Sequence, residues 1–189
     1  YAEPLQIDGR HGIDLIAAGK GEGAAIGWFE APKKVENIEG WKWHSISPMG
    51  WVMSILTQDM DDDGDTDIIV TDRRQGLRGC RWLENPGKRK KQKQEWNSHL
   101  VGGEQLEVMF MTLADLNGDG EDEMIVAERT NQSILIYHRE HANGLKWREQ
   151  IIPLPKNTGR AKSVEVGDLN GDKIPDLVVS TNTEKKELA

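Results

Sequence analysis

The sequence contains a single cysteine, only two phenylalanines and two tyrosines, and no run of eighteen apolar residues. With Cys80 as the only thiol, no disulfide can form within these 189 residues. The lack of a long apolar run predicts that no helix spans a membrane. With 37% hydrophobic and 30% charged residues, the chain is expected to fold around a packed core.

Positive charge is also scarce. The 24 Lys and Arg residues stand against 32 Asp and Glu residues, and the resulting net charge of −8 argues against nucleic acid as a partner, because that ligand needs a basic face. The basic run at 88–93 is interpreted as a solvated insertion. The sequence has no nucleotide-binding glycine motif, no Ser-His-Asp arrangement and no His and Cys cluster with zinc spacing.

The most informative feature is an acidic segment that occurs three times, at 59–67, 115–123 and 168–176. Each copy has oxygen-bearing side chains at positions 1, 3, 5 and 9 and then continues into an aliphatic run such as 68–70. So many carboxylates within nine residues repel one another unless a cation lies among them. Calcium takes about six to eight oxygen ligands, so it is the cation that these segments predict.

The residues after each acidic segment distinguish it from other calcium loops. Position 12 is Val70, Val126 or Val179, where an EF-hand has a bidentate Glu and a following helix. We therefore expect position 9 to be the last ligand and the carbonyl of position 7 to point inward. The predicted metal ligands are Asp59, Asp61, Asp63, Asp65, Asp67, Asp115, Asn117, Asp119, Glu121, Glu123, Asp168, Asn170, Asp172, Ile174 and Asp176.

Position 6 of each segment has to make a sharp turn, which Gly64 and Gly120 can make with a positive φ. Lys173 occupies this position in the third copy, so that site is predicted to be the weakest. Two to three structural calcium ions are therefore expected in the three loops. They would neutralise most of the net negative charge.

A fourth, decayed copy precedes the others. Counted at the ninth position, the copies fall at residues 14, 67, 123 and 176, which is a period of 53 to 56 residues. In the decayed copy at 6–14, position 5 is Arg10, and a cation in the cage excludes calcium. We predict no metal there and expect Arg10 to supply the positive charge internally.

Aromatic segments recur in phase with these loops. The segments at 28–32 and 82–86 correspond, and His44 and His99 take the same place in successive units. A catalytic histidine is normally unique, so we interpret these two as packing residues. Of the seven tryptophans, Trp43 is the one out of phase, and it is the candidate for contact with a carbohydrate.

One repeat unit predicts four short strands, for example at 108–113, 123–127, 134–137 and 147–152. Four strands at this period are typical of a β-propeller blade. The predicted fold class is all-β, with about 3.5 blades of four antiparallel strands in the repeat units 1–52, 53–107, 108–160 and 161–189. Closed propellers have about four to eight blades, so we expect a segment of a larger ring.

The Asp-rich loops, each followed by an aliphatic strand, resemble those of the FG-GAP/VCBS repeat family, and the segments at 28–32 and 82–86 are similar to VCBS proteins. The resemblance covers essentially the whole chain. It implies a β-propeller, commonly of about seven blades, with calcium in the loop between the first two strands of a blade. The Phe-Gly and Gly-Ala-Pro signatures of the integrin-like branch are absent, so no integrin-type role is implied.

Members of this family include adhesion modules, lectins and sugar-active lyases or dehydratases, so function is less determined than fold. We expect a calcium-binding module for carbohydrate or protein; the alternative is a polysaccharide lyase or sugar dehydratase with a site on the axial face of the propeller. No catalytic residue is assigned. The candidate ligand-binding residues, which could instead be solvated loop tips with salt bridges, are Arg73, Arg74, Glu128, Arg129 and Trp43.

The expected location follows from calcium supply. Loops without the bidentate Glu are not expected to fill at cytosolic calcium, which favours an extracellular or periplasmic protein. No signal peptide lies within these residues, which begin at Tyr1. The expected partners are further blades of the same parent protein and a carbohydrate or protein ligand.

Overall fold

The computed structural model describes residues 1–87 and 96–183, so the basic run at 88–93 lies outside the described residues. Within these ranges the chain forms fourteen β-strands and two short 3-10 helices. The 3-10 helices are η1 (Ile38–Gly40) and η2 (Gln75–Leu77). The all-β prediction is confirmed.

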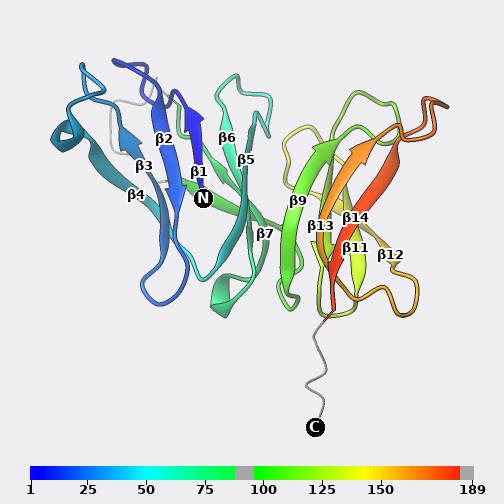
Figure 1. Cartoon of the computed structure of the whole chain (residues 1–189). Helices are drawn as coiled ribbons and strands as arrows, with labels where there is room; N and C mark the ends of the chain where they lie inside the picture. The colour runs from blue at the N-terminus through cyan, green and yellow to red at the C-terminus, as the bar shows by residue number, and fades with distance from the viewer. Residues whose placement is uncertain (88–95, 184–189) are drawn as a thin grey trace, which may run out of the picture.

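The strands form four antiparallel sheets in which each strand pairs with its neighbours in sequence (Figure 1). The first sheet contains β1 (Ala2–Leu5), β2 (Asp14–Ala18), β3 (Ala25–Glu30) and β4 (Lys42–Pro48). The second contains β5 (Val52–Gln58), β6 (Asp67–Asp72), β7 (Gly79–Glu84) and β8 (Asn97–Gly102). The third contains β9 (Val108–Ala114), β10 (Glu123–Glu128), β11 (Ser133–Arg139) and β12 (Trp147–Pro153). The fourth contains β13 (Arg160–Gly167) and β14 (Asp176–Asn182).

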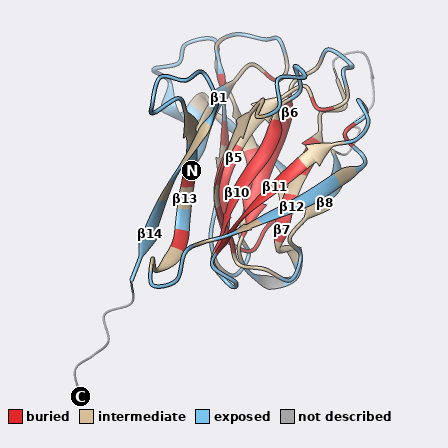
Figure 2. Ribbon diagram, turned by 90° about the vertical axis from the view of Figure 1, so that its right-hand side faces the viewer, coloured by how far each residue is buried: buried red, intermediate tan, exposed pale blue. Residues whose placement is uncertain are grey.

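Burial changes from the inner to the outer strands of a sheet (Figure 2). All six residues of β6 and of β10 are buried, because both faces of these aliphatic strands are covered. In the three four-stranded sheets, the fourth strands β4, β8 and β12 contain no buried residue, and β12 is the most exposed of them. The predicted strands at 108–113, 123–127, 134–137 and 147–152 lie within β9 to β12.

Three hydrophobic clusters fill the spaces between successive sheets. Along β10, Met124 and Val126 pack in the cluster shared with the second sheet, whereas Ile125 and Ala127 pack in the cluster shared with the fourth. This alternation follows from the two-residue period of a strand. Each inner sheet is therefore held on both faces by its neighbours in the chain. Cys80 is fully buried in the cluster between the second and third sheets, where burial raises the pKa of its thiol.

Within the described residues, no helix has the length and apolar character needed to cross a bilayer.

Candidate functional site

The three acidic loops all join the first strand of a sheet to the second. They connect β5 to β6, β9 to β10 and β13 to β14. Because the sheets are antiparallel and run side by side, the loops lie at one common end of the molecule, at the top in Figure 1. The turns that follow the second strands lie at the opposite end.

The acidic loops share a hydrogen-bond scheme that fixes their backbone. In the first, the backbone N–H groups of Asp63 and Gly64 donate to the carboxylate of Asp59 (3.2 and 2.9 Å). The N–H of Met60 donates to Asp67 (2.8 Å). The same bonds from positions 5, 6 and 2 recur in the other two loops, where the donors are Asp119, Gly120, Leu116, Asp172, Lys173 and Leu169. The side chains at positions 1 and 9 thus fix the backbone conformation of the loop by accepting its N–H groups.

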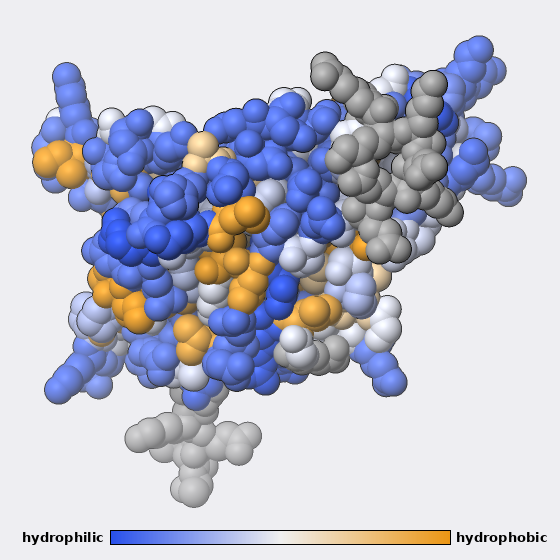
Figure 3. Space-filling view, turned by 180° about the vertical axis from the view of Figure 1, so that it is seen from behind, coloured by the Kyte–Doolittle hydropathy of each residue, from blue (hydrophilic) through white to orange (hydrophobic). Residues whose placement is uncertain are grey.

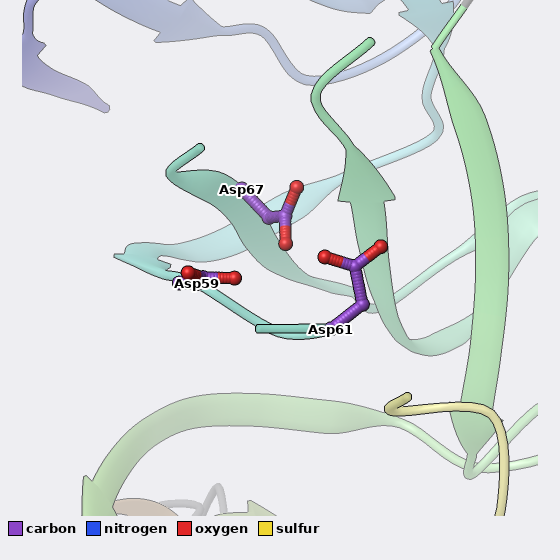
Figure 4. Close-up of side chains that lie close together, drawn as sticks. All are labelled: Asp59, Asp61 and Asp67. Atoms are coloured by element: carbon purple, nitrogen blue, oxygen red, sulfur yellow. The ribbon is translucent and has the colours of Figure 1, made fainter. Parts of the chain in front are cut away.

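Asp59, Asp61 and Asp67 come together as a candidate metal centre. One carboxylate oxygen from each lies within 4.8 Å of the others, and the three side chains face a common space (Figure 4). Oδ1 of Asp61 is buried and, among the described residues, has no hydrogen-bond partner. A buried oxygen without a donor is costly unless a cation or a water occupies the space. The geometry therefore fits a hard cation with oxygen ligands.

The electrostatics of this centre lead to the same conclusion. Asp67 is only 1% exposed, and burial raises its pKa to about 7, although the N–H groups of Asn85 and Met60 oppose the rise. Burial raises the pKa of Asp61 as well, and the nearby charge of Asp63 adds to it. Both carboxylates therefore resist ionisation in the apo protein, and a divalent cation would remove that penalty.

In the loop at 115–123, protein groups already contact the ninth position. Nδ2 of Asn117 donates to Oε1 of Glu123 (2.9 Å), and Nδ1 of His138 lies 3.2 Å from the same oxygen. The carboxylate of Glu121 pairs with Arg139 (3.3 Å), so only its carbonyl is available at position 7. A cation here would compete with Asn117 and His138 for Glu123.

The loop at 168–176 is the most exposed of the three. Lys173 has the positive φ of 68° predicted for position 6, and Ile174 is 64% exposed. Nδ2 of Asn170 donates to Asp172 (3.0 Å). The loop keeps the backbone scheme of the others with a side chain in a conformation that favours glycine.

The second and third acidic loops lie in a region that is similar to a known protein family. A family model described as an FG-GAP-like repeat matches residues 115–179, which run from the second acidic loop to the strand after the third. The match covers about a third of the chain. The predicted resemblance to FG-GAP repeats is confirmed over this range, whereas the segments similar to VCBS proteins, 28–32 and 82–86, lie outside it. No curated protein matches the chain.

The decayed first loop keeps part of the backbone scheme of the acidic loops by a different chemistry. Asp14, at position 9, accepts the N–H of Ile7 (2.9 Å), as its counterparts do. Nε2 of Gln6 donates to the carbonyls of Arg10 (3.0 Å) and Gly12 (2.5 Å), which are positions 5 and 7. The carbonyl at position 7 is the one that we expect to face a metal in the other loops. The amide of Gln6 thus takes the place of the cation.

This arrangement corrects the role expected for Arg10. Its guanidinium lies 3.8 Å from Asp8, and the side chain is 70% exposed, so it stays outside the loop. The donor inside the loop is the neutral amide of Gln6.

The recurring histidines occupy equivalent places in their sheets. His44 stacks on Trp28 (ring centroids 4.4 Å apart) and His99 on Trp82 (4.2 Å). Nε2 of His99 also lies 2.8 Å from Glu84, and Nε2 of His44 lies 2.9 Å from Glu30. These contacts join the third and fourth strands of each sheet, which is what a packing role requires.

The structure brings only some of the predicted ligand-binding residues together: Arg73 and Arg129 both contact Glu107. Arg73 pairs with Glu107 (3.1 Å), and the guanidinium of Arg74 lies over Trp51 (4.6 Å to the ring centroid). Glu128 is fully buried and accepts hydrogen bonds from its own turn, from Thr130, Asn131 and Ser133. Trp43 is 43% exposed on β4 against Phe29, apart from the arginines.

The turns at the end opposite the acidic loops line two open hollows that share residues. The hollows measure about 440 and 390 Å³. Arg78 and Gln105 line both of them. The other lining residues are Gly76, Arg81, Glu104, Glu107, Arg129, Thr130, Gln132 and Arg160. Arg129 is the one predicted ligand residue in this set.

Proposed function

We propose that this chain is a calcium-stabilised segment of a β-propeller that serves as a binding module. The proposal rests first on the order of the sheets. Four antiparallel sheets follow one another along the chain, and each packs on the next through its own hydrophobic cluster. Such repetition of meander sheets is typical of propeller blades. About 3.5 blades would be present here, as part of a ring of about seven.

The observation that carries the calcium proposal is the group of Asp59, Asp61 and Asp67, with its partnerless buried oxygen on Asp61. When bound, calcium would supply positive charge to carboxylates that otherwise repel one another and resist ionisation. The acidic side chains and the carbonyl of position 7 would hold it. Because the unfolded chain does not gather these oxygens, binding would stabilise the folded state.

A binding role, rather than catalysis, is the proposal that the described residues support. The face seen in Figure 3 is mostly hydrophilic, with apolar side chains in separate groups, which favours a polar ligand such as carbohydrate over an apolar one. A propeller that depends on loops without the bidentate Glu suits the calcium concentration outside the cytosol. We therefore propose a secreted or periplasmic module for carbohydrate or protein.

Thermal unfolding in calcium and in chelator tests the structural role of the metal. Each site that is filled to 100 times its dissociation constant adds about 2.7 kcal/mol to the free energy of unfolding. Calcium should therefore raise the unfolding midpoint by several degrees. Asp61→Ala should lose part of that rise. Asp62→Asn removes the same charge from the same loop at a position that is not a ligand, and it should keep the full rise.

If chelator and calcium give the same unfolding midpoint for the unmodified protein, calcium has no structural role and the proposal fails. If Asp62→Asn loses as much of the calcium response as Asp61→Ala, the effect is one of overall charge, and the proposed centre is wrong.

A further inference from the structure

We propose that the end of the sheets opposite the acidic loops binds an acidic saccharide in the two hollows that meet at Arg78. This inference rests on the proposed function in one respect, since it takes the chain to be a binding module. It does not require calcium. It assigns a site and a ligand class to that module.

Three successive sheets build the site. Arg78 immediately precedes β7 and Arg81 lies within it, Gln105 comes from the connection between β8 and β9, and Arg129 from the turn after β10. Arg160 adds the first residue of β13. A ligand lying across both hollows would touch turns from the second, third and fourth sheets together.

The lining is cationic in a chain that is anionic overall. Four arginines line the hollows, against Glu104 and Glu107, although the whole chain carries a net charge of −8. Glu107 lies 3.1 Å from Arg73 and 3.9 Å from Arg129, so its charge is already shared between two cations. The excess of guanidinium groups would attract an anion.

Arg78 is the residue best placed to receive that anion. It is half-buried and belongs to both hollows. Its Nε is buried and has no hydrogen-bond partner within 1–87 and 96–183. An unsatisfied buried donor is costly, and an acceptor in the hollow would satisfy it. A guanidinium offers several donors in one plane, which matches the two oxygens of a carboxylate.

The turns around the site are fixed before any ligand arrives. The fully buried carboxylate of Asp72 accepts the N–H groups of Gly50 (2.6 Å), Trp51 (2.7 Å) and Arg74 (3.1 Å) and so orders the turn before Arg78. Gly79 has a φ of 117°, and a Cβ there would lie 2.6 Å from the carbonyl oxygen of Gly102. The backbone next to Arg78 is therefore in close contact with the backbone at the end of β8.

Glu128 has a matching role on the other side of the site. Its buried carboxylate accepts the N–H of Asn131 (2.8 Å) and the hydroxyl of Ser133 (3.0 Å), which orders the turn that carries Thr130 and Gln132. Glu128 is thus a positioning residue. A fixed, polar hollow loses less entropy when it binds than a loose one.

The rest of the lining selects the ligand class. Besides the charged residues it contains Gln105, Thr130 and Gln132, which can exchange hydrogen bonds with hydroxyl groups. Among the described residues, no aromatic or aliphatic side chain lines it. An open, polar hollow with guanidinium groups suits a ligand that combines an acid group with many hydroxyls. An acidic saccharide, carboxylated or sulfated, has this chemistry.

Calorimetric titration with defined probes tests the site. The probes are an oligogalacturonate, a sulfated oligosaccharide of similar length and a neutral oligosaccharide. We expect at least one acidic probe to bind and the neutral one not to bind. Arg78→Gln should weaken binding about tenfold or more, because it removes a charged donor. Arg148→Gln makes the same change at an exposed position on β12 and should leave affinity unchanged.

The outcomes separate this inference from the calcium proposal. A preference for the carboxylated or the sulfated probe would support the site and identify the acid group. Absence of binding to both acidic probes, or equal weakening by Arg78→Gln and Arg148→Gln, would overturn it. If the calcium shift in unfolding remains while acidic probes do not bind, only this inference fails. If acidic probes bind without any calcium shift, only the calcium proposal fails.

Discussion

Gln6→Glu should convert the first loop from a metal-free turn into one that depends on calcium. The side chain of Gln6 now donates to the carbonyls of Arg10 and Gly12 and accepts the N–H of Gly9 (2.8 Å). Glutamate keeps the accepted bond and loses both donated bonds. It also leaves two carbonyl oxygens facing a carboxylate with no donor or cation between them.

The size of the effect follows from those two bonds. Each is worth about 1 kcal/mol, so Gln6→Glu should lower the free energy of unfolding by about 2 kcal/mol in chelator. For a chain of this length the unfolding midpoint should fall by about 4 to 8 °C. Calcium should recover part of the loss, and more of it when Arg10→Asp is added, because the fifth position then also carries a carboxylate.

Gln6→Met is the matched control. It has a similar shape and removes the same donors, but a thioether is a poor ligand for calcium. Its unfolding midpoint should fall in chelator and should gain no more from calcium than the unmodified protein does. The measurement is thermal unfolding followed by circular dichroism, with and without calcium. If Gln6→Glu is as stable as the unmodified protein in chelator, the amide does not take the place of the cation.

Two further substitutions test the packing and the loops. Gly27→Ala would place a Cβ 2.3 Å from the carbonyl oxygen of His44, so it should cost about 3 kcal/mol of unfolding free energy. Gly167→Ala meets nothing within 4 Å and should stay within about 0.5 kcal/mol of the unmodified protein in denaturant titrations; equal effects would contradict the register of β3 and β4. Lys173→Gly should relieve a left-handed backbone and raise stability by about 0.5 kcal/mol in calcium, after the entropy of glycine is subtracted. Lys173→Ala removes the same charge without that relief, so a gain from alanine as large as that from glycine would assign the effect to charge.

Much of the fold could be predicted from sequence because each acidic loop is followed by a run of aliphatic residues, which predicts a strand. Val126 and Val179 follow their loops at a fixed distance in runs of aliphatic residues, and these runs form β10, which is buried, and β14, which is half-buried to exposed. The bounds of β9 to β12 were predicted within two residues for the same reason. Periodicity in the chain translates directly into repetition of sheets.

The candidate sites were less accessible to sequence reasoning. Gln6 differs from the aspartate expected at position 1, and comparison of ligands alone registers only the loss of a carboxylate. The amide of Gln6 can donate into the loop only if the carbonyls of Arg10 and Gly12 point inward. That orientation is set by the backbone conformation of the loop. Conversely, the positive charge of Arg10 predicts that it fills the loop, but its long side chain reaches solvent at little cost.

Arg78 was missed for another reason. The hollows are formed by turns from three sheets, and no local motif marks such a meeting point. One signal was present, since Arg78 and Gln132 each immediately precede the third strand of their sheets. Residues at equivalent positions of successive repeats lie next to one another, and Arg78 and Gln132 line the same hollow.

The acidic loops and the arginine-lined turns lie at opposite ends of the strands. This separation of charge gives the molecule an electric dipole moment along the strands. Near a negatively charged surface, such as a layer of acidic polysaccharide, the favourable orientation presents the guanidinium end to the surface and turns the aspartates toward bulk solution. At low ionic strength this orienting torque acts before contact is made. The protein would then be oriented while it approaches the surface. Added salt would lower the association rate constant more than it raises the dissociation rate constant.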